Sequence, residues 1–186
     1  ILADYKSPRL EGLPPFTGGL VGYFSYDYLG YSEPSVRYEA EDAEQFKDVD
    51  LMLFDKVIAF DNLLQKIVLI VNIPVDSLEA SYNRAVLTLD QMEAVLRHGP
   101  QKPSVPGRLL EEVRPLFSRE EFCGKVEAVK SHIREGDIFQ LVLSNPMEAR
   151  FEGSLLDAYR ILRTTNPSPY MFYFSGEVEL AGASPE

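Results

Sequence analysis

Hydrophobic and polar residues follow a strand-like spacing through most of the first half of the chain. The run over 20–26 is rich in aromatic residues, and two longer apolar runs cover 50–61 and 63–72, so each is predicted to be a strand. Positions 61–62 are suited to a hairpin turn, and we therefore expect the two longer strands to pair antiparallel. Gly22 inside the first run indicates a bulge or a close approach of another backbone. The polar stretch after these aromatic residues is predicted to be a loop.

The spacing becomes helical after the third apolar run. Asp76-x-x-Glu79 has the form of a capping box with aspartate at the cap, and Gly99-Pro100 is a typical helix end. Apolar residues between these signals recur at intervals of three and four, which predicts one core-facing helix. Its apolar stripe consists of Leu78, Tyr82, Ala85, Leu89, Met92 and Leu96.

A second helix is predicted beyond a stretch that contains prolines and glycine. This stretch, 101–114, is the best candidate linker, and the predicted regions are therefore 1–114 and 115–186. Ser118-x-x-Glu121 forms a full capping box, and Gly136 ends the helix. The apolar face of the helix carries Phe122, Val126, Val129 and Ile133.

The last third is predicted to alternate short strands with one more helix. We expect a strand over 138–143, a helix over 154–163, and two strands over 171–174 and 178–181. The chain is therefore predicted to have an α+β fold, with largely antiparallel β-sheets and helices packed outside.

Composition narrows the class of protein further. Apolar residues make up 45% of the chain, and no apolar run reaches the roughly 18 residues of a membrane span. The net charge of −11 repels phosphate backbones, which argues against nucleic acid as a partner. Cys123, the only cysteine, rules out an internal disulfide and fits a reducing compartment, so we expect a cytoplasmic protein. The two histidines, 34 positions apart, do not form a zinc-ligand cluster.

Three short segments in the last third carry candidate chemistry. They are Gly136-Asp137-Ile138-Phe139-Gln140-Leu141-Val142-Leu143-Ser144, Asn166-Pro167-Ser168-Pro169-Tyr170-Met171-Phe172 and Gly182-Ala183-Ser184-Pro185-Glu186. Each also has a purely structural interpretation: a helix stop, an ordinary loop held extended by its X-Pro steps, and a helix start with serine as the cap.

Taken together, in this order and spacing, the three segments resemble the chorismate-utilising enzyme family, and most closely its anthranilate synthase component I branch. The segments over 18–27 and 50–55 also resemble that family, so the resemblance spans residues 14–186. The sister branch that makes aminodeoxychorismate differs in the segments matching 138–140 and 169–171. It remains an alternative, as does a non-catalytic tryptophan-binding module.

The resemblance implies an enzyme of tryptophan biosynthesis, a carbon–oxygen lyase. It would convert chorismate and ammonia to anthranilate and pyruvate, with ammonia supplied from glutamine by a partner amidotransferase. Glu186 matches the proposed general acid for the departing hydroxyl, and Gln140 matches a position where family members that add water carry lysine. A helix-start glutamate and a strand-edge glutamine are the structural alternatives for these two residues.

The resemblance also implies feedback inhibition by L-tryptophan. Pro169, Tyr170 and Met171 are the expected inhibitor contacts, with Asn166 and Ser168 as supports. The chain starts at isoleucine, and the family's other inhibitor-binding segment is expected upstream of it. The Mg²⁺ ligands and the chorismate-holding Gly-Thr segment are expected beyond residue 186. This fragment alone is therefore expected to be inactive, with exposed strand edges that favour self-association.

Overall fold

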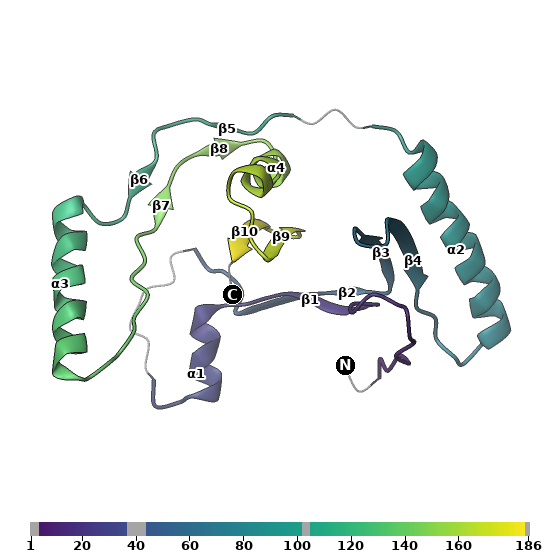
Figure 1. The fold of residues 1–186 in the computed structure, drawn as a ribbon, viewed down its shortest axis with the longest axis horizontal. Helices are drawn as coiled ribbons and strands as arrows, with labels where there is room; N and C mark the ends of the chain where they lie inside the picture. The colour runs from purple at the N-terminus through teal and green to yellow at the C-terminus, as the bar shows by residue number, and fades with distance from the viewer. Residues whose placement is uncertain (1–3, 37–43, 102–104, 185–186) are drawn as a thin grey trace. The chain divides into compact units, whose positions relative to one another are not determined.

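The computed structural model describes residues 4–36, 44–101 and 105–184, and the chain forms two compact units (Figure 1). Unit 1 covers Ile1–Gln101 and unit 2 covers Lys102–Glu186. The five strand pairs of the described residues are all antiparallel, and helices pack on two of them, so the α+β prediction is confirmed. The change of unit falls at the start of the predicted linker, and the division into 1–114 and 115–186 stays a prediction.

The first hairpin of unit 1 joins β1 (Gly19–Phe24) to β2 (Val49–Phe54). Gly22 lies opposite Leu51 in a regular register, so the chain has no bulge there. A Cβ atom at Gly22 would lie only 1.9 Å from the Asp50 carbonyl oxygen. Glycine is therefore required at this position by the close approach of the neighbouring backbone.

The predicted strand over 50–61 is wrong, because the chain turns at Asp55. Residues beyond the turn form β3 (Lys56–Asp61), which pairs with β4 (Lys66–Val71) in a separate hairpin. The Asp55 carbonyl accepts hydrogen bonds from the Asn72 backbone N–H at 2.7 Å and from its side-chain amide at 3.2 Å. The same amide donates to the Thr17 carbonyl at 2.7 Å, so one asparagine holds the corner between the two hairpins.

The turn between β3 and β4 covers 62–65 and is longer than the predicted two residues. The Asp61 carboxylate accepts from the backbone N–H groups of Leu63 at 3.0 Å and Leu64 at 2.8 Å. Gln65 takes a positive φ of 52° before the chain enters β4. The turn is therefore built by an aspartate side chain that replaces a backbone acceptor.

Three helical elements complete unit 1. A short turn, η1 (Tyr26–Tyr28), begins at the last residue of the predicted strand over 20–26, and α1 (Leu29–Ser32) lies where a loop was predicted, over 28–47. The long helix α2 (Leu78–His98) packs on β4 and ends before Gly99 as predicted. Its N-cap is Ser77, whose side chain makes no capping bond, so the predicted capping box at Asp76 is wrong. Within the described ranges, Ala85 of α2 is the only buried residue, and it keeps 9% of its surface exposed.

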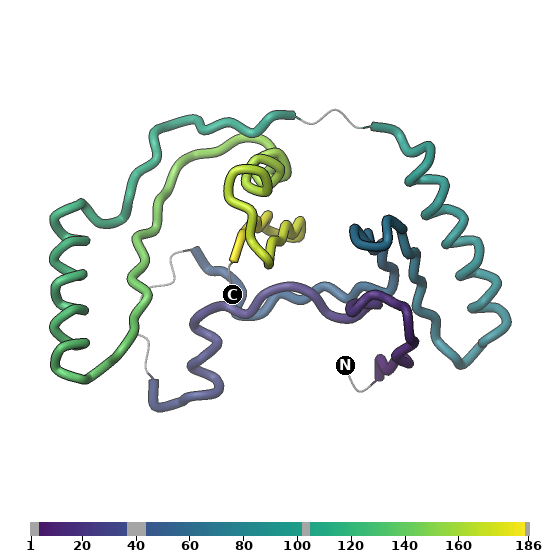
Figure 2. The backbone as a smooth tube through the Cα atoms, in the orientation of Figure 1, coloured from purple at the N-terminus to yellow at the C-terminus, as the bar shows by residue number. Residues whose placement is uncertain are grey.

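Unit 2 begins with two backbone runs that lie side by side and lead to and from one helix (Figure 2). In these runs β5 (Arg108–Leu109) pairs with β8 (Phe151–Glu152), and β6 (Arg114–Pro115) pairs with β7 (Met147–Glu148). The helix between them is α3 (Arg119–Glu135).

Both predicted ends of α3 are confirmed. Ser118 Oγ accepts from the Glu121 backbone N–H at 3.2 Å, and the Glu121 carboxylate accepts from the Ser118 N–H at 2.8 Å. Gly136 follows the helix with φ 85°. In this left-handed conformation the N–H groups of Gly136 and Asp137 cap the Ile133 and His132 carbonyls.

The predicted strand over 138–143 is wrong. This described segment has no ladder partner, and Phe139 and Val142 are 96% and 86% exposed. Apolar, β-branched residues favour a strand, but a strand forms only where a second backbone supplies the hydrogen bonds.

The remainder of unit 2 is a helix packed on a hairpin. Helix α4 (Leu155–Thr165) contacts both β9 (Tyr170–Ser175) and β10 (Glu179–Ser184). The helix and both strands were predicted, with ends that differ by a few residues. Among the described residues, no helix combines the length and apolar character that a membrane crossing requires.

Candidate functional site

The candidate site covers residues 166–171, which are the turn between α4 and β9 together with the first two residues of β9. Asn166 is the C-cap of α4, and its N–H donates to the Leu162 carbonyl at 2.9 Å. Pro167 and Pro169 have no N–H to continue the helical pattern and restrict the residues before them to extended conformations. The chain therefore leaves the helix abruptly and enters β9 at Tyr170.

Ser168 ties this turn to the far end of the hairpin. Its hydroxyl lies 3.0 Å from the Tyr170 carbonyl and also within hydrogen-bond reach of the Ser184 carbonyl. Tyr170 and Ser184 are themselves register partners at the end of the β9–β10 ladder. The turn and the last described residue of β10 are thus joined by one side chain.

Exposure divides the predicted inhibitor contacts into two groups. Asn166, Pro169 and Tyr170 are exposed, and Tyr170 retains 64% of its accessible surface. Ser168 and Met171 are half-buried, and Met171 pairs with Ala183 across the ladder. A ligand at the turn would therefore meet an aromatic ring and a proline ring first, with Ser168 behind them.

A polar network anchors the other side of the hairpin to α4. The half-buried Glu179 carboxylate accepts from the Tyr173 hydroxyl at 2.5 Å, the Leu155 N–H at 2.8 Å and the Ser154 hydroxyl at 2.9 Å. These hydrogen bonds hold the pKa of Glu179 below its usual value, and the bond from Tyr173 has the largest effect. The carboxylate also lies at the first turn of α4, where the helix dipole favours negative charge.

Of the two predicted catalytic residues, only Gln140 lies among the described residues. Gln140 is exposed on the unpaired segment after α3, and no hydrogen bond among the described residues joins it to 166–171. Glu186 lies outside the described residues. The roles of both residues therefore remain predictions from the resemblance.

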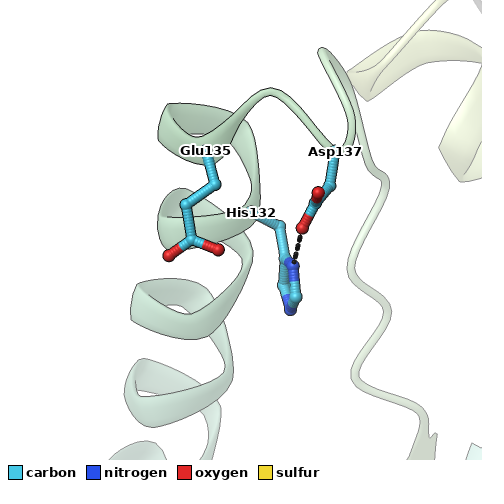
Figure 3. Close-up of side chains that lie close together, drawn as sticks. All are labelled: His132, Glu135 and Asp137. Carbon is cyan, nitrogen blue, oxygen red and sulfur yellow. Dashed lines mark hydrogen bonds and ion pairs between the residues drawn. The ribbon is translucent and has the colours of Figure 1, made fainter.

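Among the described residues, one group of side chains could converge on a metal ion, at the end of α3. It consists of His132, Glu135 and Asp137, all exposed, with ligand atoms within 4.8 Å of one another (Figure 3). Mg²⁺ prefers six oxygen ligands, whereas this group offers an imidazole whose Nδ1 already lies 2.8 Å from the Asp137 carboxylate. The group therefore does not fit Mg²⁺; its His132–Asp137 contact joins the last turn of α3 to the residue after Gly136, and Glu135 accepts from the Ser131 hydroxyl at 3.0 Å.

Glu179 and Tyr173 are the residues of this region that sequence reasoning missed. The helix was predicted to begin at Ser154, which is instead its N-cap, with a hydroxyl that accepts from the Leu156 N–H at 3.2 Å. No local pattern shows that a glutamate 25 positions later would join this cap. Only the hairpin register brings it there.

Comparison with known proteins places this fold and its motifs in one family. The family described as chorismate binding enzyme matches residues 2–186. Anthranilate synthase component 1 of Acinetobacter calcoaceticus is 40% identical over 99% of this chain, and the probable anthranilate synthase component 1 of Schizosaccharomyces pombe is 33% identical over all of it. The crystal structure of anthranilate synthase component I from Streptococcus pneumoniae TIGR4 matches all of this chain with a TM-score of 0.76 and 30% identity.

The matches cover only part of each relative. The chain spans 39% of both curated relatives and 42% of the solved chain. The predicted resemblance to anthranilate synthase component I is nonetheless confirmed across nearly every residue of this chain. Sequence, fold and comparison agree, and the chain belongs to the chorismate-binding enzyme family.

Proposed function

We propose that this chain is part of the synthase subunit of an anthranilate synthase, which converts chorismate and ammonia to anthranilate and pyruvate in tryptophan biosynthesis. One observation carries the proposal: relatives named anthranilate synthase component 1 match 99–100% of the chain at 33–40% identity. The anthranilate-like segments at 138–140 and 169–171 favour this branch over the one that makes aminodeoxychorismate.

The proposed roles of Gln140 and Glu186 follow from the chemistry of their side chains. A glutamine amide is not a base at neutral pH, but it donates and accepts hydrogen bonds and suits the placement of ammonia. A carboxyl group at Glu186 supplies a proton to the departing hydroxyl if its surroundings keep it protonated. Together these roles describe substitution by ammonia rather than by water.

The proposed inhibitor site is the 166–171 turn, with L-tryptophan as the ligand. The exposed Tyr170 ring and the half-buried Met171 supply apolar surface for an indole group. Backbone carbonyls of a turn with two prolines supply acceptors for an ammonium group. A glutamine amidotransferase is the proposed ammonia source, and the cytoplasm is the proposed location.

We place the Mg²⁺ ligands of this enzyme outside the described residues, because the one candidate group within them does not suit that ion. The chain by itself is proposed to be inactive. Its test is incubation of the isolated 186 residues with chorismate, Mg²⁺ and ammonium, beside the full-length protein, and turnover by the isolated chain would contradict the proposal.

The decisive experiment identifies the product of the full-length protein. Chorismate, Mg²⁺ and an ammonium salt are supplied, and products are resolved by fluorescence and mass, with an ammonium-free reaction as the control. Ammonium-dependent anthranilate together with pyruvate is the expected result. An amine that retains the enolpyruvyl group would assign the protein to the aminodeoxychorismate branch, and tryptophan binding without turnover would indicate a non-catalytic module.

A further inference from the structure

We propose that the end of α3 binds a divalent transition-metal ion of the zinc class through His132, Glu135 and Asp137. The three side chains are exposed, and their ligand atoms lie within 4.8 Å of one another (Figure 3). The inference goes beyond the proposed function, whose metal ion is Mg²⁺. It assigns a ligand to the one group of side chains among the described residues that could hold a metal ion.

The backbone at the end of α3 brings these side chains together. His132 and Glu135 are three positions apart on one helix, so they emerge from neighbouring places on its surface. Gly136 takes a φ of 85°, and this left-handed conformation turns the chain back, so that the Asp137 N–H donates to the His132 carbonyl at 3.0 Å. The Asp137 carboxylate then lies 2.8 Å from His132 Nδ1. The helix end itself therefore builds the group.

The charges around the group favour a cation. Among the described residues, neither of its carboxylates has a lysine or arginine partner, and the nearby Lys130 donates to Glu127 instead, at 2.6 Å. The group also lies at the C-terminal end of a helix, where the dipole attracts positive charge. Two carboxylates without a cationic partner thus leave an excess of negative charge at this helix end.

The donor atoms determine the class of ion. One imidazole nitrogen and two carboxylates suit zinc, which binds nitrogen and oxygen ligands at about 2.0–2.2 Å and accepts water at a further position. The ion takes the place of the proton between His132 Nδ1 and Asp137, and that proton leaves to solvent. Glu135, which now accepts from the Ser131 hydroxyl at 3.0 Å, turns toward the ion. All three ligands are exposed, so these rotations disturb no packed core.

The experiment measures zinc binding to the full-length protein by calorimetry, in excess Mg²⁺ so that sites for that ion stay filled. The variants are His132→Ala, which removes the nitrogen ligand, and Glu135→Gln, which keeps an acceptor for Ser131 but loses the charge. His98→Ala is the matched control. His98 is also an exposed histidine in the last turn of a helix, α2, but it belongs to no group of potential metal ligands within the described ranges.

We expect His132→Ala and Glu135→Gln each to raise the zinc dissociation constant at least about tenfold, while His98→Ala stays within about twofold of the wild type. A wild-type protein that binds no zinc in excess Mg²⁺ would overturn the inference. So would a dissociation constant that either substitution of a ligand leaves unchanged. Circular dichroism checks that the variants fold, and Glu135→Gln alone decides the outcome if His132→Ala does not.

Discussion

The Tyr173 hydroxyl lies 2.5 Å from the Glu179 carboxylate, and this bond joins neighbouring strands of the hairpin that carries the candidate site. The same carboxylate accepts from the first turn of α4 through the Leu155 N–H and the Ser154 hydroxyl. One side chain therefore fixes the hairpin on the helix. The 166–171 turn, which connects the two, inherits its geometry from this anchor.

This anchor should weaken in acid. The pKa of Glu179 is lowered in the folded chain, so its stabilising effect is complete above the usual value of about 4.5 and is lost as the pH falls through the lowered folded value. We expect amide-exchange protection of the first turn of α4 to fall below that pH in the wild type. Glu179→Gln should reduce this protection several-fold at pH 7 and flatten its dependence on pH.

A second variant tests the contribution of the Tyr173 hydroxyl alone. Tyr173→Phe keeps the ring, whose centroid lies 6.0 Å from that of Tyr159, but removes the bond to Glu179. We expect it to raise the pKa of Glu179 toward its usual value, as followed by carbon NMR of the carboxyl group. An unchanged titration would show that the Tyr173 bond is not what lowers this pKa.

Two glycines of the α3 region should respond in opposite directions to alanine. Gly136 has φ 85° with open space around it, so Gly136→Ala should cost about 1 kcal/mol of helix stability from backbone strain alone. Gly124 lies inside the helix, also with open space, and Gly124→Ala should gain about 0.5–1 kcal/mol. Circular dichroism of a peptide covering 116–138 measures both, and changes of the same sign would refute this account.

The capping box of α3 gives a separate prediction in the same peptide. Ser118→Ala should cost about 1 kcal/mol of helix stability. The bond from the Ser118 N–H lowers the pKa of Glu121, so the contribution of Glu121 is present above its usual value of about 4.5 and declines in more acidic solution. The difference in helicity between wild type and Glu121→Gln should therefore vanish at low pH; a difference that persists at pH 2 would point to packing instead.

Gln140 provides the most direct test of the proposed chemistry. In the full-length protein, Gln140→Lys should lower ammonium-dependent anthranilate formation at least about tenfold, because an ammonium side chain no longer offers an acceptor to ammonia. Gln91→Lys introduces the same charge on the exposed surface of α2 and should leave the rate unchanged. Equal rates for both variants would remove Gln140 from the site.

Local signals predicted most of the elements but not every boundary. The capping box at Ser118 and the glycine at 136 set both ends of α3, since each acts within one helical turn. The strand break at Asp55 was missed, because residues on both sides are apolar and the corner is held by Asn72, 17 positions later. The segment 138–143 was predicted as a strand from composition, yet pairing depends on a second backbone.

In the candidate site, too, local features were predicted from the sequence and long-range contacts were not. Its two prolines predicted a rigid turn that enters a strand, and the structure has this turn at 166–169, before β9 begins at Tyr170. The reach of the Ser168 hydroxyl to the Ser184 carbonyl depends on which residue of β10 lies opposite Tyr170, and only the register of the hairpin determines that. Sequence alone therefore identified the segment but not its internal connections.

The paired runs on either side of α3 also bear on which changes of length this unit tolerates. A Cβ atom at Gly153 would lie 2.9 Å from the Cα of Gly107, so the two ends of the excursion over 108–152 lie next to each other within unit 2 (Figure 2). Segments with adjacent ends are the ones that tolerate insertion and exchange. We therefore expect changes of length within this excursion to leave the helix and hairpin of the candidate site in place, whereas exchange of the whole excursion would also exchange Gln140.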